Sequence, residues 1–273
     1  MRVLVLGTSH AATLRRAFGD FVQSLTEADK DRAPPPAPMD LQFWGLPGAA
    51  FLKAAIGPDG VLRPDPADPV GLRKSTEWNG SAALDLAGFD RIWLVGLRHG
   101  LRPVLQIMRA LQPYDWGKRA GTRSGVQGVS LGFLRAAIRA EVDAGLSAQA
   151  ARIPFDARMT ALPAPYPAKM VTATGAQAGS LGEPVTRAVA QLERAADLMA
   201  LYEDEVAAAH AAHGLGHLPQ PRETLAAPFL TDDRYVDDPA QDARHMNSAY
   251  GLIALKALKA ASDARPNTPN RPD

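Results

Sequence analysis

The sequence predicts an α/β protein whose parallel sheet is covered by helices on both faces. Short, wholly apolar runs such as Val3–Leu6 and Ile92–Val95 are typical of strands buried on both sides. Segments with apolar residues three or four positions apart follow some of these runs, as expected for amphipathic helices. Because strands and helices alternate along the chain, the strands are expected to run parallel.

The first part of the chain contains three predicted strands, which are Val3–Leu6, Leu41–Trp44 and Asp90–Gly96. A helix is expected after the first strand, since apolar residues recur at helical spacing between Leu14 and Leu25. The proline-rich segment 33–38 is expected to form a rigid loop. Residues 52–80 hold several Gly, Pro and Asp, which favours irregular surface structure with a hairpin near Asp59-Gly60.

The predicted elements of the remaining chain are a helix over Leu131–Val142, a strand over Met159–Leu162, an amphipathic helix over Val185–Met199 and a last helix over His245–Ala261. Prolines stop the strand at Pro163. The polar, Pro-rich tail 262–273 is expected to be disordered. Residues 1–261 are therefore expected to form a single α/β domain.

Bulk composition excludes several functional classes. The 30 Lys and Arg nearly balance the 29 Asp and Glu, and the chain has no basic block of the kind that marks nucleic-acid-binding surfaces. It has no cysteine, which excludes disulfides, thiol catalysis and thiolate metal sites. The first apolar run is too short for a signal peptide, and no segment approaches a membrane span. We therefore expect a cytoplasmic protein with no nucleic-acid or membrane partner; composition favours no particular oligomeric state.

A serine and a histidine stand where the first strand turns into the first helix, in the stretch Gly7-Thr8-Ser9-His10. At a helix N-terminus the backbone N–H of Ser9 points outward, and the helix dipole favours negative charge. Ser9 is thus a candidate both for attack on a carbonyl and for binding the resulting oxyanion. The alternative is that Thr8 or Ser9 simply caps the helix.

Near the other end of the chain, Asp242 precedes His245 by three residues. At this spacing a turn allows the carboxylate to accept a hydrogen bond from one ring nitrogen, which leaves the other free to face a hydroxyl. The alternative is local: Asp242 caps the last helix, and His245 is a surface residue in its first turn.

Taken in order, these motifs resemble the SGNH hydrolases, the GDSL-like lipase and esterase superfamily, over nearly the whole chain. Residues 7–10 are similar to that family's first block, and residues 242–251 (DARHMNSAYG) are similar to its last block. Residues 85–96 resemble the strand before the third block, and residues 161–168 resemble the proline-rich end of a later strand. The resemblance implies a three-layer α/β/α sandwich around a mostly parallel five-stranded sheet, as in flavodoxin-like proteins.

The resemblance also assigns roles to single residues. It implies that Ser9 is the nucleophile, His245 the base and Asp242 the residue that orients the base. It further implies an oxyanion hole formed by Ser9 and Gly45, with Gly48 as the second candidate for the glycine.

The third block is where the chain departs from the family. Gly96-Leu97-Arg98-His99 stands where Gly-x-Asn-Asp is expected, so Arg98 replaces the asparagine that completes the oxyanion hole. Loss of one such donor typically lowers the rate by about a hundred- to a thousandfold. Arg98 or His99 is a candidate for the missing donor or for binding an anionic group of the substrate.

A histidine-rich segment offers a competing interpretation. His210, His213 and His217, with Glu203 and Glu205 upstream, are spaced so that they could bind a metal. Because two glycines interrupt the helix before His217, we expect solvent-facing histidines instead, and no metal or other cofactor.

Two classes of function follow from these motifs. The first is a serine ester hydrolase or acyltransferase that acts on a small acyl ester, such as an O-acetylated carbohydrate, through an acyl-Ser9 intermediate. The second is a non-catalytic SGNH-like protein that binds a carbohydrate or an anionic ligand through Arg98 and His99.

Overall fold

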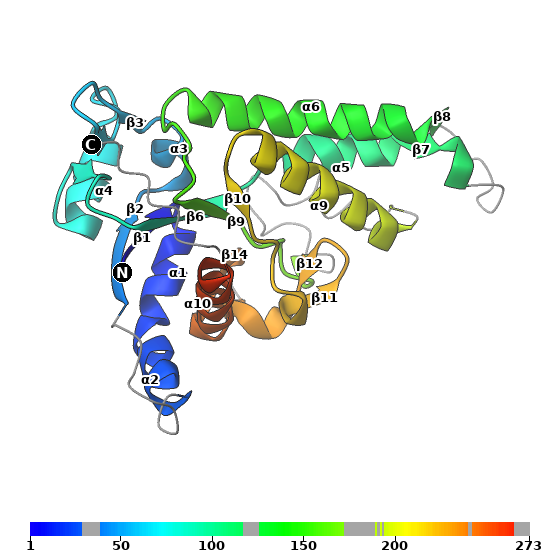
Figure 1. The fold of residues 1–273 in the computed structure, drawn as a ribbon. Coiled ribbons are helices and arrows are strands. Elements are labelled where there is room, and N and C mark those ends of the chain that lie inside the picture. The colour runs from blue at the N-terminus through cyan, green and yellow to red at the C-terminus, as the bar shows by residue number, and fades with distance from the viewer. Residues whose placement is uncertain are drawn as a thin grey trace.

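A computed structural model confirms the α/β class and the parallel sheet (Figure 1). It describes residues 1–28, 39–116, 126–171, 189, 192, 194–239 and 242–264. Within these residues the main sheet has five strands in the order β10-β9-β6-β1-β2, and every neighbouring pair is parallel. Counted along the chain, this is the 2-1-3-4-5 order of flavodoxin-like sheets.

The strands of the main sheet are β1 (Arg2–Gly7), β2 (Asp40–Gly45), β6 (Arg91–Leu97), β9 (Met159–Pro163) and β10 (Gly216–His217). The longer helices are α1 (His10–Arg16), α2 (Phe18–Ala28), α4 (Pro69–Asn79), α5 (Leu101–Ala110), α6 (Leu131–Ala150), α9 (Ala195–Ala212) and α10 (Ser248–Asp263). The short elements are α3 (Gly48–Phe51), β3 (Ala55–Ile56), β4 (Val61–Arg63), β5 (Leu84–Asp85), β7 (Leu111–Pro113), β8 (Gln127–Val129), β11 (Leu225–Ala227), β12 (Leu230–Thr231), β13 (Val236–Asp238) and β14 (Asp242–Met246). None of the helices in the described ranges is long and apolar enough to cross a membrane.

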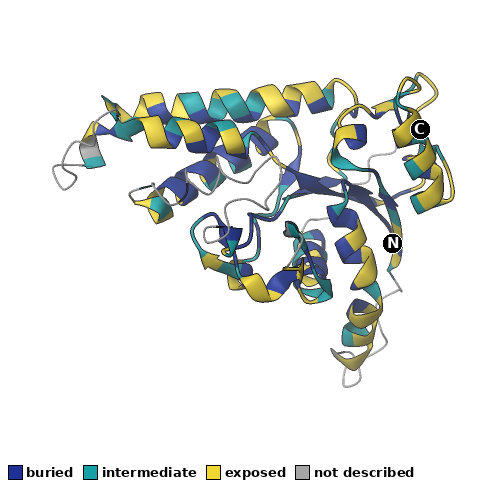
Figure 2. Cartoon of the chain, turned by 180° about the vertical axis from the view of Figure 1, so that it is seen from behind, coloured by how far each residue is buried: buried dark blue, intermediate teal, exposed yellow. Residues whose placement is uncertain are grey.

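Each face of the sheet has its own apolar core, because successive side chains of a strand point to opposite sides. Leu4 and Leu6 of β1 join the core that α5, α6 and α9 cover. Val3 and Val5 join the core under α1 and α10. Figure 2 shows the buried sheet between these two layers of helices, whose outer faces are exposed. This is the sandwich that the apolar runs predict.

Most local predictions are confirmed, with one clear exception in residues 52–80. The expected hairpin is present, because β3 and β4 pair antiparallel around a turn at Gly57–Gly60. The segment is not irregular throughout, however, since α4 occupies its second half. Asp68 caps that helix by accepting a hydrogen bond from Gly71 N, and Pro69 occupies its first position. Both are helix-start signals that the abundance of Gly, Pro and Asp obscured.

The last helix begins later than predicted. The side chain of Asn247 caps α10 by accepting hydrogen bonds from the first-turn amides of Ala249 and Tyr250. His245 therefore lies on β14, before the helix, and α10 continues to Asp263, past the predicted boundary at residue 261. The loop 33–38, residues 185–188 of the predicted helix 185–199 and the tail 265–273 lie outside the described residues. α9 begins only at Ala195, because the left-handed backbone of Arg194 (φ 54°) starts the helix there, and it continues to Ala212, so the predicted bounds are wrong for α9.

Gly7 occupies a position that only glycine fits. A Cβ there would lie 2.0 Å from the carbonyl oxygen of Val95 on the neighbouring strand, so the backbone would have to shift. We expect Gly7→Ala to lower the free energy of unfolding by about 2–3 kcal/mol, as overpacking does elsewhere, measured by urea denaturation. The control is Gly19→Ala on the exposed side of α2, where nothing lies within 4 Å of the added atom. Equal unfolding midpoints for the two variants would contradict this account.

Candidate active site

The candidate site lies at the carboxyl ends of three neighbouring strands. β1 pairs with β2 on one side and with β6 on the other, so successive strands are added on opposite sides of β1. This is the topological switch point, where open parallel sheets bind their ligands. Ser9 follows β1, Gly45 ends β2 and Arg98 follows β6. Three of the residues singled out from the sequence therefore meet at one edge of the sheet.

Ser9, His245 and Asp242 form a continuous chain of hydrogen bonds. Ser9 Oγ lies 2.8 Å from His245 Nε2, and His245 Nδ1 lies 2.5 Å from Asp242 Oδ2. An ionised carboxylate can only accept, so the Nδ1 of His245 carries the proton that is donated to Asp242. The Nε2 atom then has a free lone pair directed at the hydroxyl of Ser9. Folding thus brings the serine, the imidazole and the carboxylate together from opposite ends of the chain.

The helix-capping alternatives are wrong for these residues. Ser9 is the residue before α1, but its side chain makes no capping hydrogen bond and is directed to His245 instead. The hydroxyl of Thr8 donates to the carbonyl of Gly96 at 3.4 Å. Asp242 lies on β14, and the cap of α10 is Asn247. The hydroxyl of Ser9 and the carboxylate of Asp242 are therefore free for the contacts that link them to the imidazole.

The strand that carries His245 is fixed against the helix that begins beside Ser9. Thr13 Oγ1, on α1, donates to the carbonyl of Met246 at 2.9 Å. β13 pairs antiparallel with β14, and the N–H of Asn247 donates to the carbonyl of Tyr235 at 2.8 Å. These contacts hold β14 in place without relying on the Ser9–His245 hydrogen bond itself.

The carboxyl group of Asp242 is held in its ionised form. Arg244 donates to Asp242 Oδ1 from its backbone N–H at 2.8 Å and from its Nε at 3.1 Å. Partial burial alone would raise the pKa of Asp242, but the hydrogen bonds from Arg244 and His245 outweigh it and lower that pKa to about 2. Asp242 therefore stays charged throughout the neutral range and keeps the imidazole in one tautomer.

His10 is a part of the site to which the sequence pattern assigns no role. Its ring packs beside that of His245, with centroids 5.4 Å apart and 36° between the ring planes. It is buried, and its Nδ1 has no hydrogen-bond partner within the described part of the chain. Burial, assisted by the charge of Arg98, lowers the pKa of His10 to about 3. His10 therefore stays neutral beside an imidazole that becomes charged if it accepts the serine proton.

The backbone of Gly45 is engaged by Asn79, the last residue of α4. The Gly45 N–H donates to Asn79 Oδ1 at 2.9 Å, and Asn79 Nδ2 donates to the Gly45 carbonyl at 3.0 Å. The amide that the resemblance assigns to the oxyanion hole is thus already paired in this structure.

Gly48 is the first residue of α3, and the N–H groups of a first turn have no acceptor within their helix. Asn79-Gly80 is typical of a helix end, but the sequence gives no sign of the contact with Gly45.

Arg98 and His99 are neighbours in sequence but lie in different surroundings. His99 has a φ of 39°, and its ring packs edge-on against His210 with centroids 4.4 Å apart. Only 6% of His99 is exposed, so its ring offers no surface to a substrate. Arg98 is exposed and lines a small cavity at the ends of β6 and β9. Of the two residues, Arg98 is the one that a ligand can reach.

The three histidines considered as metal ligands, His210, His213 and His217, do not come together as one group. His210 and His217 face each other, with their Nδ1 atoms 2.9 Å apart, and His99 is the third member of their cluster. His213 instead lies 4.0 Å from Asp143. His210 is fully buried, so the expectation of a solvent-facing residue is wrong there. No group of three or more His, Asp or Glu among the described residues is arranged to hold a metal ion.

Burial keeps this cluster uncharged. The loss of solvation is the largest cause that lowers the pKa of each ring, to about 3 for His99, about 2 for His210 and about 4 for His217. The cluster is therefore neutral at pH 7.

No protein-family model matches this sequence, and no curated protein matches it. Among solved structures, an extracellular lipase from Streptomyces rimosus is similar over 96% of this chain and 99% of its own, with 15% sequence identity and a TM-score of 0.38. A phospholipase A1 from Streptomyces albidoflavus is similar over 95% of this chain and 98% of its own, with 13% identity and a TM-score of 0.33.

Proposed function

We propose that the protein is an SGNH-type serine hydrolase or acyltransferase that acts on a small acyl ester through an acyl-Ser9 intermediate. The observation that carries the proposal is the hydrogen-bonded chain from Ser9 Oγ through His245 to Asp242, with distances of 2.8 and 2.5 Å. A serine hydroxyl is a weak nucleophile unless an oriented base takes its proton, and this chain supplies that base. O-acetyl groups on carbohydrates belong to the substrate class that we propose.

The proposed reaction has two matched steps. His245 Nε2 takes the proton of Ser9 as Oγ attacks the ester carbonyl, and it returns that proton to the alcohol that leaves. Water, or the hydroxyl of an acceptor molecule, then attacks the acyl group on Ser9 while His245 takes its proton and returns it to Oγ. The carboxylate of Asp242 stabilises the imidazolium that forms in each step.

The oxyanion requires N–H donors at the same edge of the sheet. We assign one to the backbone N–H of Ser9, where the dipole of α1 favours negative charge. The second donor is the N–H of Gly45 if the substrate displaces the side chain of Asn79, and the N–H of Gly48 otherwise. The proposal therefore holds with two backbone donors and does not require an asparagine at position 98.

Labelling with a fluorophosphonate tests this proposal, because the probe phosphonylates serines that a neighbouring base activates. We expect the wild-type protein to be labelled once per chain and to hydrolyse 4-nitrophenyl acetate. Ser9→Ala should lose both properties, whereas Ser24→Ala, a control on α2, should keep them. A folded wild-type protein that resists the probe and leaves the ester intact would contradict the proposal. That result would favour a protein that only binds a carbohydrate or anionic ligand.

A further inference from the structure

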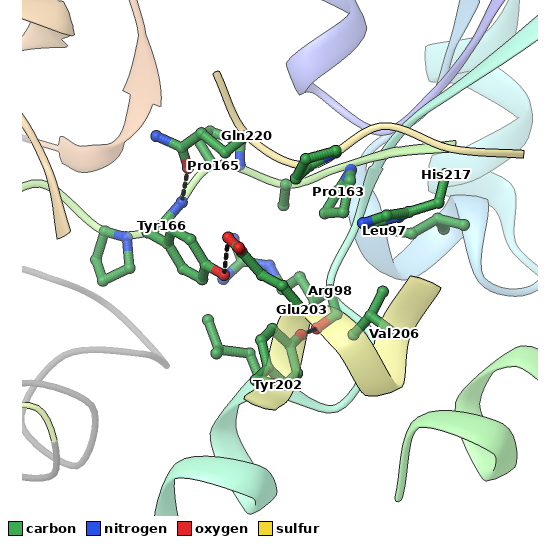
Figure 3. Close-up of a pocket in the computed structure, with 14 residues that line it drawn as sticks. Leu97, Arg98, Pro163, Pro165, Tyr166, Tyr202, Glu203, Val206, His217 and Gln220 are labelled. Atoms are coloured by element: carbon green, nitrogen blue, oxygen red, sulfur yellow. Dashed lines mark hydrogen bonds between the residues drawn. The ribbon is translucent and has the colours of Figure 1, made fainter. Parts of the chain in front are cut away.

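We propose that the substrate of this site carries an anionic oxygen group, such as a carboxylate, which Arg98 binds at the mouth of the cavity at the carboxyl ends of β6 and β9. The inference rests on the proposed function and narrows its substrate class. Arg98 follows β6 and lines the cavity together with Tyr166 and Glu203 (Figure 3). The resemblance to SGNH hydrolases puts an uncharged asparagine at this position, so Arg98 places a positive charge where that pattern has none.

Within the part of the chain that the structure describes, the positive charge of Arg98 has no carboxylate in contact with it, although the charge of Asp242 reaches it from further away. The guanidinium takes part in no hydrogen bond and no ion pair among the described residues, although the backbone carbonyl of Arg98 lies 3.5 Å from the hydroxyl of Tyr202. The nearest other arginine of the site, Arg244, is different in this respect, because its Nε lies 3.1 Å from Asp242 Oδ1. Arg98 is therefore the arginine of this site that remains available to a ligand.

The two carboxylates that could neutralise Arg98 are already occupied. Asp242 accepts hydrogen bonds from His245 and Arg244. Glu203, which lines the same cavity as Arg98, is paired with Arg222 and accepts a hydrogen bond from the hydroxyl of Tyr166 at 3.4 Å. Neither acid is free to rotate towards Arg98 without giving up these partners. The local balance around the triad is two guanidinium groups, Arg98 and Arg244, against the single carboxylate of Asp242.

The surroundings of Arg98 destabilise its charged form when no anion is bound. Partial desolvation by the surrounding protein and repulsion from Arg244 lower the pKa of Arg98 from its ordinary value. Its charge also reaches the triad, since it acts on both His10 and Asp242. An anionic group on a bound ester would relieve the repulsion and would accept the planar, forked hydrogen bonds that guanidinium groups offer to carboxylates.

The shape of the cavity places the anion at its mouth and not inside it. Its volume is about 20 Å³, which is room for little more than one water molecule. Leu97, Leu101 and Val206 contribute apolar walls, and the segment Pro163–Pro167 forms another side. A hydrated anion does not fit such a space, whereas the exposed side of Arg98 is open to one.

Matched pairs of esters test the inference. In the first pair the acyl part carries the charge: 4-nitrophenyl hemisuccinate is anionic, and its methyl ester is neutral and of nearly the same shape. In the second pair the alcohol part carries it: an O-acetylated methyl glucuronoside is compared with the O-acetylated methyl glucoside. We expect the wild-type protein to prefer the anionic member of at least one pair. Added salt should reduce that preference, because it screens charges.

Arg98→Gln should remove this preference selectively. We expect kcat/KM for the preferred anionic ester to fall about 10- to 100-fold, the range of a lost charge-assisted hydrogen bond, mainly through a higher KM. The neutral ester should lose much less than the anionic one, because only the longer-range effect of Arg98 on the triad is removed, and Arg98→Lys should restore part of the loss. Arg73→Gln, which removes an exposed positive charge from α4, is the control and should leave both esters unchanged.

Two results would overturn the inference while leaving the proposed function intact. One is an equal loss for both members of each pair, which would make Arg98 a donor in the reaction itself. The other is an unchanged kcat/KM for every ester. The fluorophosphonate should still label Ser9 in folded Arg98→Gln; loss of labelling there would make Arg98 part of the reaction machinery and would also overturn the inference. If the wild-type protein is not labelled at all, the proposed function fails, and this inference fails with it.

Discussion

Replacement of Ser9 by alanine is expected to reduce the hydrolysis of 4-nitrophenyl acetate by about 10⁴-fold or more, because the proposed nucleophile is lost and only binding and the oxyanion donors remain. His245→Ala should cost about as much. The double variant should be no slower than either single variant, since residues that act as one unit do not have additive effects. Losses that multiply would mean that Ser9 and His245 act independently, contrary to the 2.8 Å contact between them.

Controls separate chemistry from folding in this experiment. Urea unfolding of each variant shows whether the domain remains intact, and Ser24→Ala reports the effect of removing a serine hydroxyl elsewhere. Asp242→Asn is the informative third variant, because an amide can donate to Nδ1 and so favour the wrong tautomer of His245. A fall of about 10⁴-fold is expected for it. Retention of more than about a tenth of the activity in Ser9→Ala would contradict the assigned nucleophile.

Acidification from pH 7.5 to pH 4.5 is expected to destabilise the fold strongly. His10 and His99 are buried, and burial lowers the pKa of each to about 3, whereas the unfolded chain titrates near 6.5. The folded state keeps these rings neutral while the unfolded state gains protons below pH 6.5, so stability is complete above that pH and is lost as the pH falls towards 3. At pH 4.5, two units below 6.5, each ring contributes a loss of about 3 kcal/mol. These two rings together reach about 5 kcal/mol or more, comparable with the stability of a whole small domain, and His210 and His217 add to the loss because burial lowers their pKa values too.

Urea unfolding at the two pH values measures this loss directly. Asp242 has a pKa of about 2 in the folded protein, so above pH 4.5 it is charged in both the folded and the unfolded state. It therefore adds little to the difference in unfolding free energy between the two pH values. His99→Phe should reduce the difference in unfolding free energy between the two pH values by about 3 kcal/mol, since one buried titrating ring is removed. Equal midpoints at pH 7.5 and 4.5 would contradict the burial of these histidines, and so would an unchanged difference in His99→Phe.

The strands and the meeting of Ser9, His245 and Asp242 could be predicted from the sequence, the strands from local pattern and the three side chains from the order of their motifs along the chain. The wholly apolar runs at Val3–Leu6 and Ile92–Val95 report burial on both faces of a sheet. Ser9, Asp242 and His245 stand in motifs whose order along the chain is informative. The position of His245 on β14 was not predictable in this way, because that strand exists through its pairing with β13 and its contact with α1.

The contacts that the sequence did not reveal are tertiary. Asn79 reaches Gly45 across 34 positions of the chain, and no spacing rule connects a helix end with the end of a strand. His10 is adjacent to Ser9, but its contact with His245 depends on the packing of β14. Arg98 and His99 were grouped together from the sequence, yet the left-handed backbone of His99 turns the two side chains into different surroundings. Local patterns predict elements and candidate residues, whereas packing decides which neighbours they have.

The most direct measurement is to trap the acyl-enzyme and locate the acyl group. Wild-type protein would be mixed with 4-nitrophenyl acetate, quenched in acid within the first turnovers, digested and analysed by tandem mass spectrometry. The account predicts an acetyl group on the peptide that contains Ser9, attached to that residue, and none on the same peptide from Ser9→Ala. Turnover of the ester with the acetyl group on another residue, or with no adduct on Ser9 under conditions in which deacylation is slow, would contradict it.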